Sequence, residues 1–253
     1  MRILLTNDDG LSAEGLQVLY RQLKKFADIT VVAPDSERSS VGHGITLTRP
    51  LWVKKMRLSD GRWGYGTSGT PADCVKLALN IILKRKPDLI VSGINQGPND
   101  GTSIFYSGTV AGAREGALLG IPSVALSVDS LKSTDFRPAA RLSARLIQTF
   151  SKTDLPPRTF LNINFPNGRR RHYKGILVTG QGRDPIHGKF KRNKDPYGRE
   201  YFWMLAKSPL CKDDLSQDTY ALAQGYVTVT PIHCDATDQN FLAKLKNQKW
   251  PRV

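Results

Sequence analysis

Short apolar runs alternate with amphipathic segments along roughly the first 165 of the 253 residues. After the first run, apolar side chains recur at Leu16, Leu19, Tyr20 and Leu23, which is the spacing of one helix face. The apolar runs have the length and composition of buried strands. They are Ile3–Leu5, Ile29–Val32, Leu89–Val91, Val124–Val128 and Phe160–Ile163.

Three more helices are predicted between these runs. One begins at Thr70-Pro71-Ala72-Asp73, where Thr70 is a good N-cap and Pro71 suits the first helical position. Small residues predict another helix over 109–119, and apolar spacing predicts a third that ends near Phe150. This order, with short connections, predicts an α/β fold with a doubly wound, mostly parallel, Rossmann-like sheet over residues 1–165.

The pattern changes in residues 166–253, which we expect to form a C-terminal extension of one compact protein. Loops lengthen there, and two segments, Ile176–Thr179 and Glu200–Leu205, resemble hairpin strands. A short helix that ends at Gly225, a strand over Tyr226–Thr230 and a polar C-terminal helix complete the chain.

The net charge of +15 favours anionic partners and is concentrated in the extension. The stretch between residues 168 and 199 contains ten Lys and Arg but only two Asp, so it supplies +8 of the total. We interpret it as a solvated basic arm rather than a nucleic-acid footprint, because stacking aromatics are few and no nucleic-acid motif is present.

The location of the protein is predicted to be the cytoplasm. No apolar stretch is long enough to span a bilayer, and a strand begins directly after Met1-Arg2, so no signal peptide is expected. Cys74, Cys211 and Cys234 are widely spaced, which indicates reduced thiols rather than a disulfide framework or a zinc site.

Two adjacent carboxylates, Asp8 and Asp9, follow the first predicted strand, with Gly10 directly after them. Within a strand they would point to opposite faces, but at its end Gly10 lets the chain turn and both can converge. Like charges held together favour a divalent cation between them. The alternative is a solvated Asx-type turn.

Other polar loops also follow predicted strands and should open on the same rim of the sheet. Ser39 lies in the loop after the second strand, and Asn95 in the loop after Leu89–Val91. Carboxylate, hydroxyl and amide oxygens suit Mg²⁺ or Mn²⁺ rather than zinc. Taken singly, Ser39 and Asn95 have structural explanations; together with the aspartates they predict a metal site.

Ser107-Gly108-Thr109 opens the small-residue helix and predicts an anion or phosphate site, because free N–H groups and hydroxyls meet there. The alternative is simple N-capping by Ser107 or Thr109. A metal rim beside an anion cradle indicates phosphoryl chemistry. His43 is near enough in sequence to reach this site as a proton donor, although a surface or structural role is favoured.

Several blocks, in the same order, resemble those of the SurE family, the stationary-phase survival protein nucleotidases. They begin with Asn7-Asp8-Asp9-Gly10 and continue almost to the C-terminus. The other blocks are Val32–Asp35 with Arg38-Ser39, Gly69–Val75, Ser92–Asn95, Tyr106–Ala111, Leu161–Pro166 and Ala223–Pro231.

The resemblance implies a metal-dependent phosphatase, a 5′-nucleotidase acting on nucleoside 5′- and 3′-monophosphates. The family's metal ligands fall on Asp8, Asp9, Ser39 and Asn95. Its phosphate-binding residues fall on Ser107, Gly108 and Thr109, together with Asn95. The resemblance also implies a homodimer or homotetramer in which the C-terminal region exchanges elements, so the basic arm would be an interface element or part of the rim of the site rather than a nucleic-acid clamp. We expect metal-activated water as the nucleophile; the alternative is attack by Asp8 or Asp9.

Two departures from the family pattern affect loops at the site. Ser40 stands where glycine is frequent, and Gly97–Ser103 replaces a stretch that often ends in acidic residues. Two other functions also remain open: a basic nucleic-acid-binding protein on an α/β scaffold, and a phosphatase for other anions such as polyphosphate.

Overall fold

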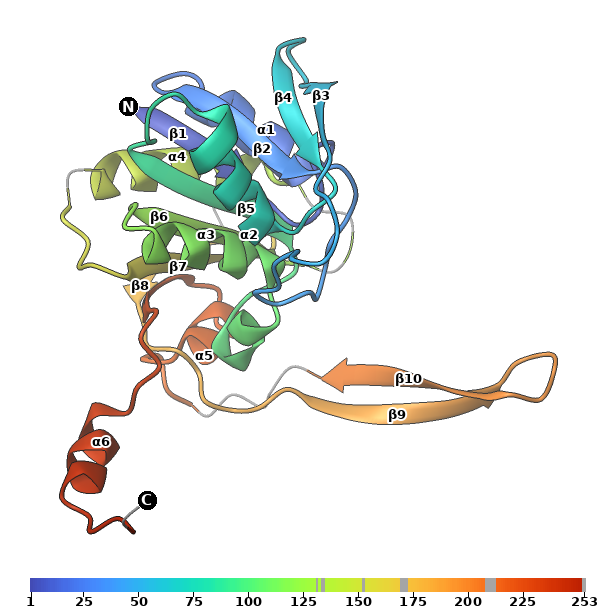
Figure 1. The fold of residues 1–253 in the computed structure, drawn as a ribbon, viewed down its shortest axis with the longest axis vertical. Helices are drawn as coiled ribbons and strands as arrows, with labels where there is room; N and C mark the ends of the chain where they lie inside the picture. The colour runs from blue at the N-terminus through green and yellow to red at the C-terminus, as the bar shows by residue number, and fades with distance from the viewer. Residues whose placement is uncertain (131, 133–134, 152, 169–172, 208–212, 252–253) are drawn as a thin grey trace.

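The computed structural model describes residues 1–130, 132, 135–151, 153–168, 173–207 and 213–251. Nine strands form one sheet in the order β3-β4-β2-β1-β5-β6-β7-β11-β8, and β9 and β10 form a separate hairpin (Figure 1). The sheet strands are β1 (Arg2–Thr6), β2 (Asp28–Pro34), β3 (Val53–Arg57), β4 (Trp63–Thr67), β5 (Leu89–Gln96), β6 (Ser123–Asp129), β7 (Thr159–Pro166), β8 (Ile176–Val178) and β11 (Val227–His233).

Helices cover both faces of the sheet (Figure 1). On one face α1 (Glu14–Leu23) packs over β1 and β5, and α4 (Arg137–Phe150) packs against α1. On the other face lie α2 (Pro71–Leu77), its continuation η1 (Ala78–Ile82), α3 (Gly108–Leu118) and α5 (Asp218–Ala223). The predicted doubly wound α/β fold is confirmed, because β4, β2, β1, β5, β6 and β7 all run parallel.

The predicted start of α2 is also confirmed in detail. The Thr70 hydroxyl accepts a hydrogen bond from the Asp73 N–H, and the Asp73 carboxylate accepts one from the Thr70 N–H. This reciprocal capping box satisfies two N–H groups that a helix start otherwise leaves unpaired.

The C-terminal part departs from the sequence prediction at one strand. The hairpin-like assignment of Ile176–Thr179 is wrong, because β8 joins the main sheet parallel to β11, which runs antiparallel to β7. An isolated three-residue segment carries no sign of its partner, so only tertiary pairing decides its place. The hairpin β3–β4 was also not predicted, since β3 reads Val-Lys-Lys-Met-Arg and lacks apolar alternation.

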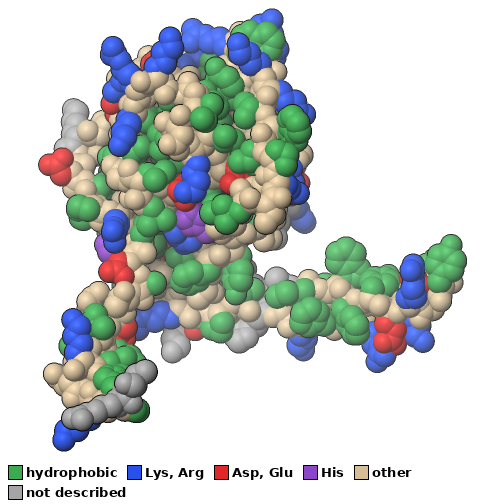
Figure 2. Space-filling view, in the orientation of Figure 1, with side chains coloured by type: hydrophobic (Ala, Val, Ile, Leu, Met, Phe, Trp, Pro, Cys, Tyr) green, Lys and Arg blue, Asp and Glu red, His purple; other side chains and the backbone are tan. Residues whose placement is uncertain are grey.

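The basic stretch folds as a long arm. Strands β9 (His187–Lys194) and β10 (Glu200–Lys207) pair antiparallel and project from the body, while α6 (Gln239–Lys246) projects separately (Figure 1). Hydrophobic side chains gather along the arm, among them Phe190, Phe202 and Trp203 (Figure 2). Arg169, Arg170, Arg171 and Cys211 lie outside the described residues.

Among the described residues, no helix has the length and apolar character needed to cross a bilayer. Cys74 lies on the buried face of α2 and Cys234 is half-buried, and both are free thiols. Burial raises the pKa of the Cys74 thiol to about 12, so this cysteine is inert packing rather than a nucleophile.

Candidate functional site

The candidate site lies where the strand order reverses. From β1 the chain moves outward to β2 and β4, then returns to the opposite side of β1 as β5, with Thr6 beside Ser92. The crevice beyond the carboxyl ends of β1 and β5 is the usual ligand site of such a sheet. Asp8 and Asp9 follow β1, and Asn95 lies near the end of β5, so the two strands place three candidate residues at one edge of the sheet.

Asp8 is held from three sides. Its side chain is only 4% exposed, its carbonyl oxygen accepts from the Arg38 N–H at 2.8 Å, and its Oδ1 accepts from the Thr109 hydroxyl. A Cβ built on Gly108 would lie 2.9 Å from Asp8 Oδ2, so α3 approaches this carboxylate as closely as glycine allows. Burial raises the pKa of Asp8, although the Thr109 hydrogen bond opposes that effect.

Asp9 lies beside it and is less buried. Its Oδ2 accepts from the Gln96 N–H at 3.4 Å, which joins the end of β1 to the end of β5. Burial first, and then the negative charge of Asp8, raise the pKa of Asp9 to about 7. Within the described part of the chain, neither carboxylate has a salt bridge.

This arrangement fits a divalent cation. Two neighbouring carboxylates without a basic partner need a positive charge, and their oxygens are hard ligands of the kind that Mg²⁺ and Mn²⁺ prefer. The described residues contain no group of three or more His, Cys, Asp or Glu able to hold a metal. The further ligands predicted from the sequence, Ser39 and Asn95, would supply neutral oxygens.

Ser39 lies in a loop that is fixed to Asp8 through the Arg38 N–H. Its hydroxyl donates to Glu37 Oε1 at 2.6 Å and is exposed. Ser40 has φ of +58°, in the left-handed region that glycine favours. The chain thus keeps a glycine-type backbone at the position where the family frequently has glycine.

Asn95 is oriented by its own loop. Its Nδ2 donates to the Gly97 carbonyl at 2.9 Å, so the amide oxygen Oδ1 is the atom left to face a ligand. The half-buried side chain lies at the end of β5, next to the Gln96 N–H that contacts Asp9.

In the predicted phosphate segment, the hydroxyls of Ser107 and Thr109 both have partners within the protein. The Ser107 hydroxyl is the N-cap of α3 and accepts from the Val110 N–H at 3.0 Å, while the Thr109 hydroxyl is spent on Asp8. What the segment offers an anion is therefore the N-terminus of an eleven-residue helix, with the Gly108 and Thr109 N–H groups in its first turn. Sequence alone indicated hydroxyl donors and did not indicate the bond from Thr109 to Asp8.

His43 belongs to a charged cluster on the side of α3. Its Nε2 lies 2.8 Å from Glu115 Oε2, and Lys76 Nζ lies 2.6 Å from Glu115 Oε1. Burial alone would raise the pKa of Glu115, but His43 and Lys76 outweigh it and hold the pKa below its usual value. The cluster ties the Ser39–Thr46 loop and α2 to α3, which is the structural role that sequence reasoning favoured for His43.

A buried polar network that the sequence did not reveal lies under residues 97–103. The Asn99 carbonyl accepts from Asn162 and Asn164 side chains, and its own Nδ2 donates to Ser127. Asp218 then accepts from the Gly101 and Gly182 N–H groups. These bonds fix the chain that leads from Asn95 to Ser107.

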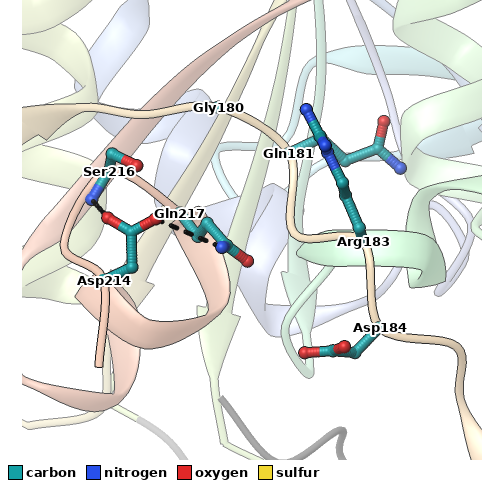
Figure 3. A pocket seen from close by; sticks show the side chains of 7 residues that line it. All are labelled: Gly180, Gln181, Arg183, Asp184, Asp214, Ser216 and Gln217. Atoms are coloured by element: carbon teal, nitrogen blue, oxygen red, sulfur yellow. Dashed lines mark hydrogen bonds between the residues drawn. The ribbon is translucent and has the colours of Figure 1, made fainter. Parts of the chain in front are cut away.

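A pocket of about 360 Å³ lies at the base of the arm (Figure 3). Arg183 and Asp184 line one side, and Asp214 on the other side accepts from the Ser216 N–H and from Gln217 (Figure 3). None of the predicted site residues lines it. It is joined to the segment 97–103 by two hydrogen bonds, from the Thr102 hydroxyl to the Asp184 carbonyl and from Gln181 Nε2 to the Gly101 carbonyl.

Comparison with known proteins identifies the family of this chain. Residues 3–187 match the family model described as Survival protein SurE. A protein named 5′-nucleotidase SurE from Syntrophobacter fumaroxidans is 44% identical over 250 residues, which cover 99% of each chain. One of that name from Desulfitobacterium hafniense is 46% identical over 248 residues, covering 97% of this chain and 96% of that protein.

The fold agrees as well. The crystal structure of the SurE protein from Aquifex aeolicus matches this chain with a TM-score of 0.85 and 40% sequence identity, covering 97% of this chain and 98% of that one. The match in sequence and in fold extends over nearly the whole length, so the resemblance read from the sequence blocks is confirmed: this chain belongs to the SurE family.

Proposed function

We propose that the protein is a divalent-metal-dependent 5′-nucleotidase, a phosphomonoesterase that releases phosphate from nucleoside 5′-monophosphates and also from 3′-monophosphates. Relatives at 44% and 46% identity bear the name 5′-nucleotidase. The observation that carries the metal requirement is the pair Asp8 and Asp9, two neighbouring carboxylates with raised pKa values and without a salt bridge in the described chain.

Mg²⁺ or Mn²⁺, held by Asp8, Asp9, Ser39 and Asn95, would polarise a phosphoryl oxygen and lower the pKa of bound water. The chain's own residues do the positioning. Thr109 fixes the rotamer of Asp8, and the first turn of α3 presents N–H groups to the phosphate oxygens. Water is the proposed nucleophile, and attack by Asp8 or Asp9 is the alternative.

The surroundings of the site complete the proposal. The exposed apolar side chains of the arm support a homodimer or homotetramer in which C-terminal elements are exchanged between subunits. The free thiols of Cys74 and Cys234 suit the cytoplasm. We propose no stable nucleic-acid partner for this protein.

The deciding experiment is phosphate release from a panel of 5′- and 3′-mononucleotides, with and without chelator. We expect turnover that chelator abolishes and Mn²⁺ or Mg²⁺ restores, and that Asp9→Ala loses. The matched control is Asp28→Asn, which changes an exposed carboxylate at the N-terminal end of β2, at the edge of the sheet away from the site. This variant should keep full activity. Turnover that persists in chelator would contradict the metal requirement. Absence of turnover together with salt-dependent RNA binding would favour the nucleic-acid function.

The two candidate nucleophiles are separated by Asp8→Asn. Loss of turnover with unchanged Mn²⁺ affinity would assign Asp8 a role as nucleophile or base. Loss of both would leave it a ligand.

A further inference from the structure

An exposed apolar surface lies directly beside the phosphate segment. Phe105 and Tyr106, which immediately precede Ser107, are 59% and 60% exposed, and Val41 is 39% exposed. We call Val41, Phe105 and Tyr106 the apolar shelf. Two neighbouring exposed aromatic side chains thus directly precede the segment proposed to hold phosphate, where an apolar part of the same ligand could lie against them.

The shelf is built from two segments that are fixed to each other. The Gly42 N–H donates to the Tyr106 carbonyl at 2.9 Å, and a Cβ on Gly42 would lie only 3.1 Å from the Phe105 carbonyl oxygen. This brings Val41, the neighbour of Gly42, to the two aromatic residues. One residue further, His43 is held by Glu115 of α3.

The backbone beneath the rings is fixed as well. Residues 101–105 form the 3-10 turn η2, and the Tyr106 N–H donates to the Ser103 carbonyl at 3.0 Å. Ile104 is buried against α3, and its carbonyl accepts from Arg114. The shelf is therefore preformed, and binding on it would order little of the backbone.

We propose that the apolar shelf is the nucleoside subsite, on which the base of a nucleoside monophosphate stacks while its phosphate lies at the N-terminus of α3. This inference rests on the proposed function. Stacking uses the face that every base has, so the shelf selects for the presence of a base rather than for its identity. Substrates that carry a phosphate but no base would not benefit from the shelf.

The test compares adenosine 5′-monophosphate with ribose 5-phosphate, which has no base. In Tyr106→Ala and in Phe105→Ala, we expect kcat/KM for the nucleotide to fall about 10-fold, mainly through KM, because stacking on an aromatic ring is lost. The value for ribose 5-phosphate should change less than about 2-fold. Tyr106→Phe keeps the ring and should keep the nucleotide preference. Trp63→Ala, an exposed aromatic at the start of β4, is the control and should leave both substrates unaffected.

Equal losses for both substrates would overturn the subsite. A change of molar mass by light scattering in the same variants would then assign the shelf to a contact between subunits. If the wild type hydrolyses neither ester, the proposed function fails and the shelf is judged by adenosine binding alone. Calorimetry should show adenosine binding to the wild type about 10-fold more tightly than to Tyr106→Ala, and equal affinities would contradict the shelf.

Discussion

Gly108 lies directly against Asp8: a Cβ built on Gly108 would be 2.8 Å from the Asp8 Cβ and 2.9 Å from its Oδ2. The helix proposed to present N–H groups to an anion is therefore in contact with the carboxylate proposed to hold the metal. The proposed metal ligand and the proposed anion site share one wall, and movement of α3 would displace both.

We expect Gly108→Ala to weaken metal binding and to destabilise the fold. The added methyl group would push Asp8 away, because the Asp8 carboxylate is buried and its Oδ1 is tied to Thr109. Mn²⁺ affinity should fall about 10-fold or more, and overpacking should lower the free energy of unfolding by about 1–3 kcal/mol. The control is Gly180→Ala, whose Cβ would lie 3.7 Å from its nearest heavy atom. Unchanged Mn²⁺ affinity in Gly108→Ala would contradict the shared wall.

Thr109 should act through Asp8. Thr109→Val removes the hydroxyl that donates to Asp8 Oδ1 while keeping the shape of the side chain. We expect Mn²⁺ affinity and kcat/KM to fall about 10-fold, the usual effect of removing a group that orients a metal ligand, and Thr109→Ser to restore both. Titration of Mn²⁺ by calorimetry checks this. A rise in KM for the nucleotide with unchanged Mn²⁺ affinity would instead mean that the hydroxyl contacts phosphate.

Replacing Ser40 should stabilise the protein. Ser40→Gly relieves a left-handed φ of +58°, which is unfavourable for residues with a Cβ, although glycine also gains entropy in the unfolded chain. The net gain should be about 0.5–1 kcal/mol in urea unfolding. Ser36→Gly, in the same loop without a positive φ, should give no gain. A loss of stability in Ser40→Gly would show that the serine side chain holds the loop.

Asp100 should make the protein less stable as the pH rises. Burial, and then the charge of Asp218, raise its pKa to about 7 in the folded protein, against an ordinary value of 3.8. Burial raises the pKa of Asp218 as well, but its carboxylate accepts from three backbone N–H groups, so Asp100 is the better holder of the proton.

The sign follows from these values. Below pH 3.8 both the folded and the unfolded chain hold the Asp100 proton, so this residue contributes nothing to the pH dependence. Between pH 4 and 7 the unfolded chain releases the proton first, and stability falls as the pH rises. Between pH 4.5 and 7.5, the free energy of unfolding of Asp100→Asn should therefore rise by at least about 1 kcal/mol relative to that of the wild type. Urea unfolding with chelator present measures this difference. Parallel stability curves for the two proteins would contradict the raised pKa.

The sequence predicted the parts of the fold whose patterns are local. β1, β2, β5, β6 and β7 are buried on both faces and appear as continuous apolar runs, and α1 has apolar side chains at helical spacing. The arm and the β3–β4 hairpin have no such pattern, because most of their side chains are exposed. Their pairing is decided by contacts that the chain makes after it folds.

For the candidate site as well, the sequence predicted some residues and could not predict some of their contacts. Parallel strands end on one edge, so the sequence order alone was enough to group Asp8, Asp9 and Asn95 at the ends of β1 and β5. The partner of Thr109 was not predictable, because it depends on the rotation of α3 against β1. Glu115 was missed for the same reason, since a carboxylate in a helix of small residues reads as exposed until α2 and the His43 loop pack over it.

The chain segments that lead into and out of the β9–β10 arm meet at one point of the body. The Gly180 N–H donates to the Ser216 carbonyl at 2.7 Å, and the Asp218 N–H donates back to the Gly180 carbonyl at 2.9 Å. The chain thus leaves and re-enters the body at adjacent residues, as it does at a surface insertion. A change in the length or sequence of the arm would therefore leave β8, α5 and β11 in place, so the arm can be altered or removed without disturbing the sheet that bears the candidate site.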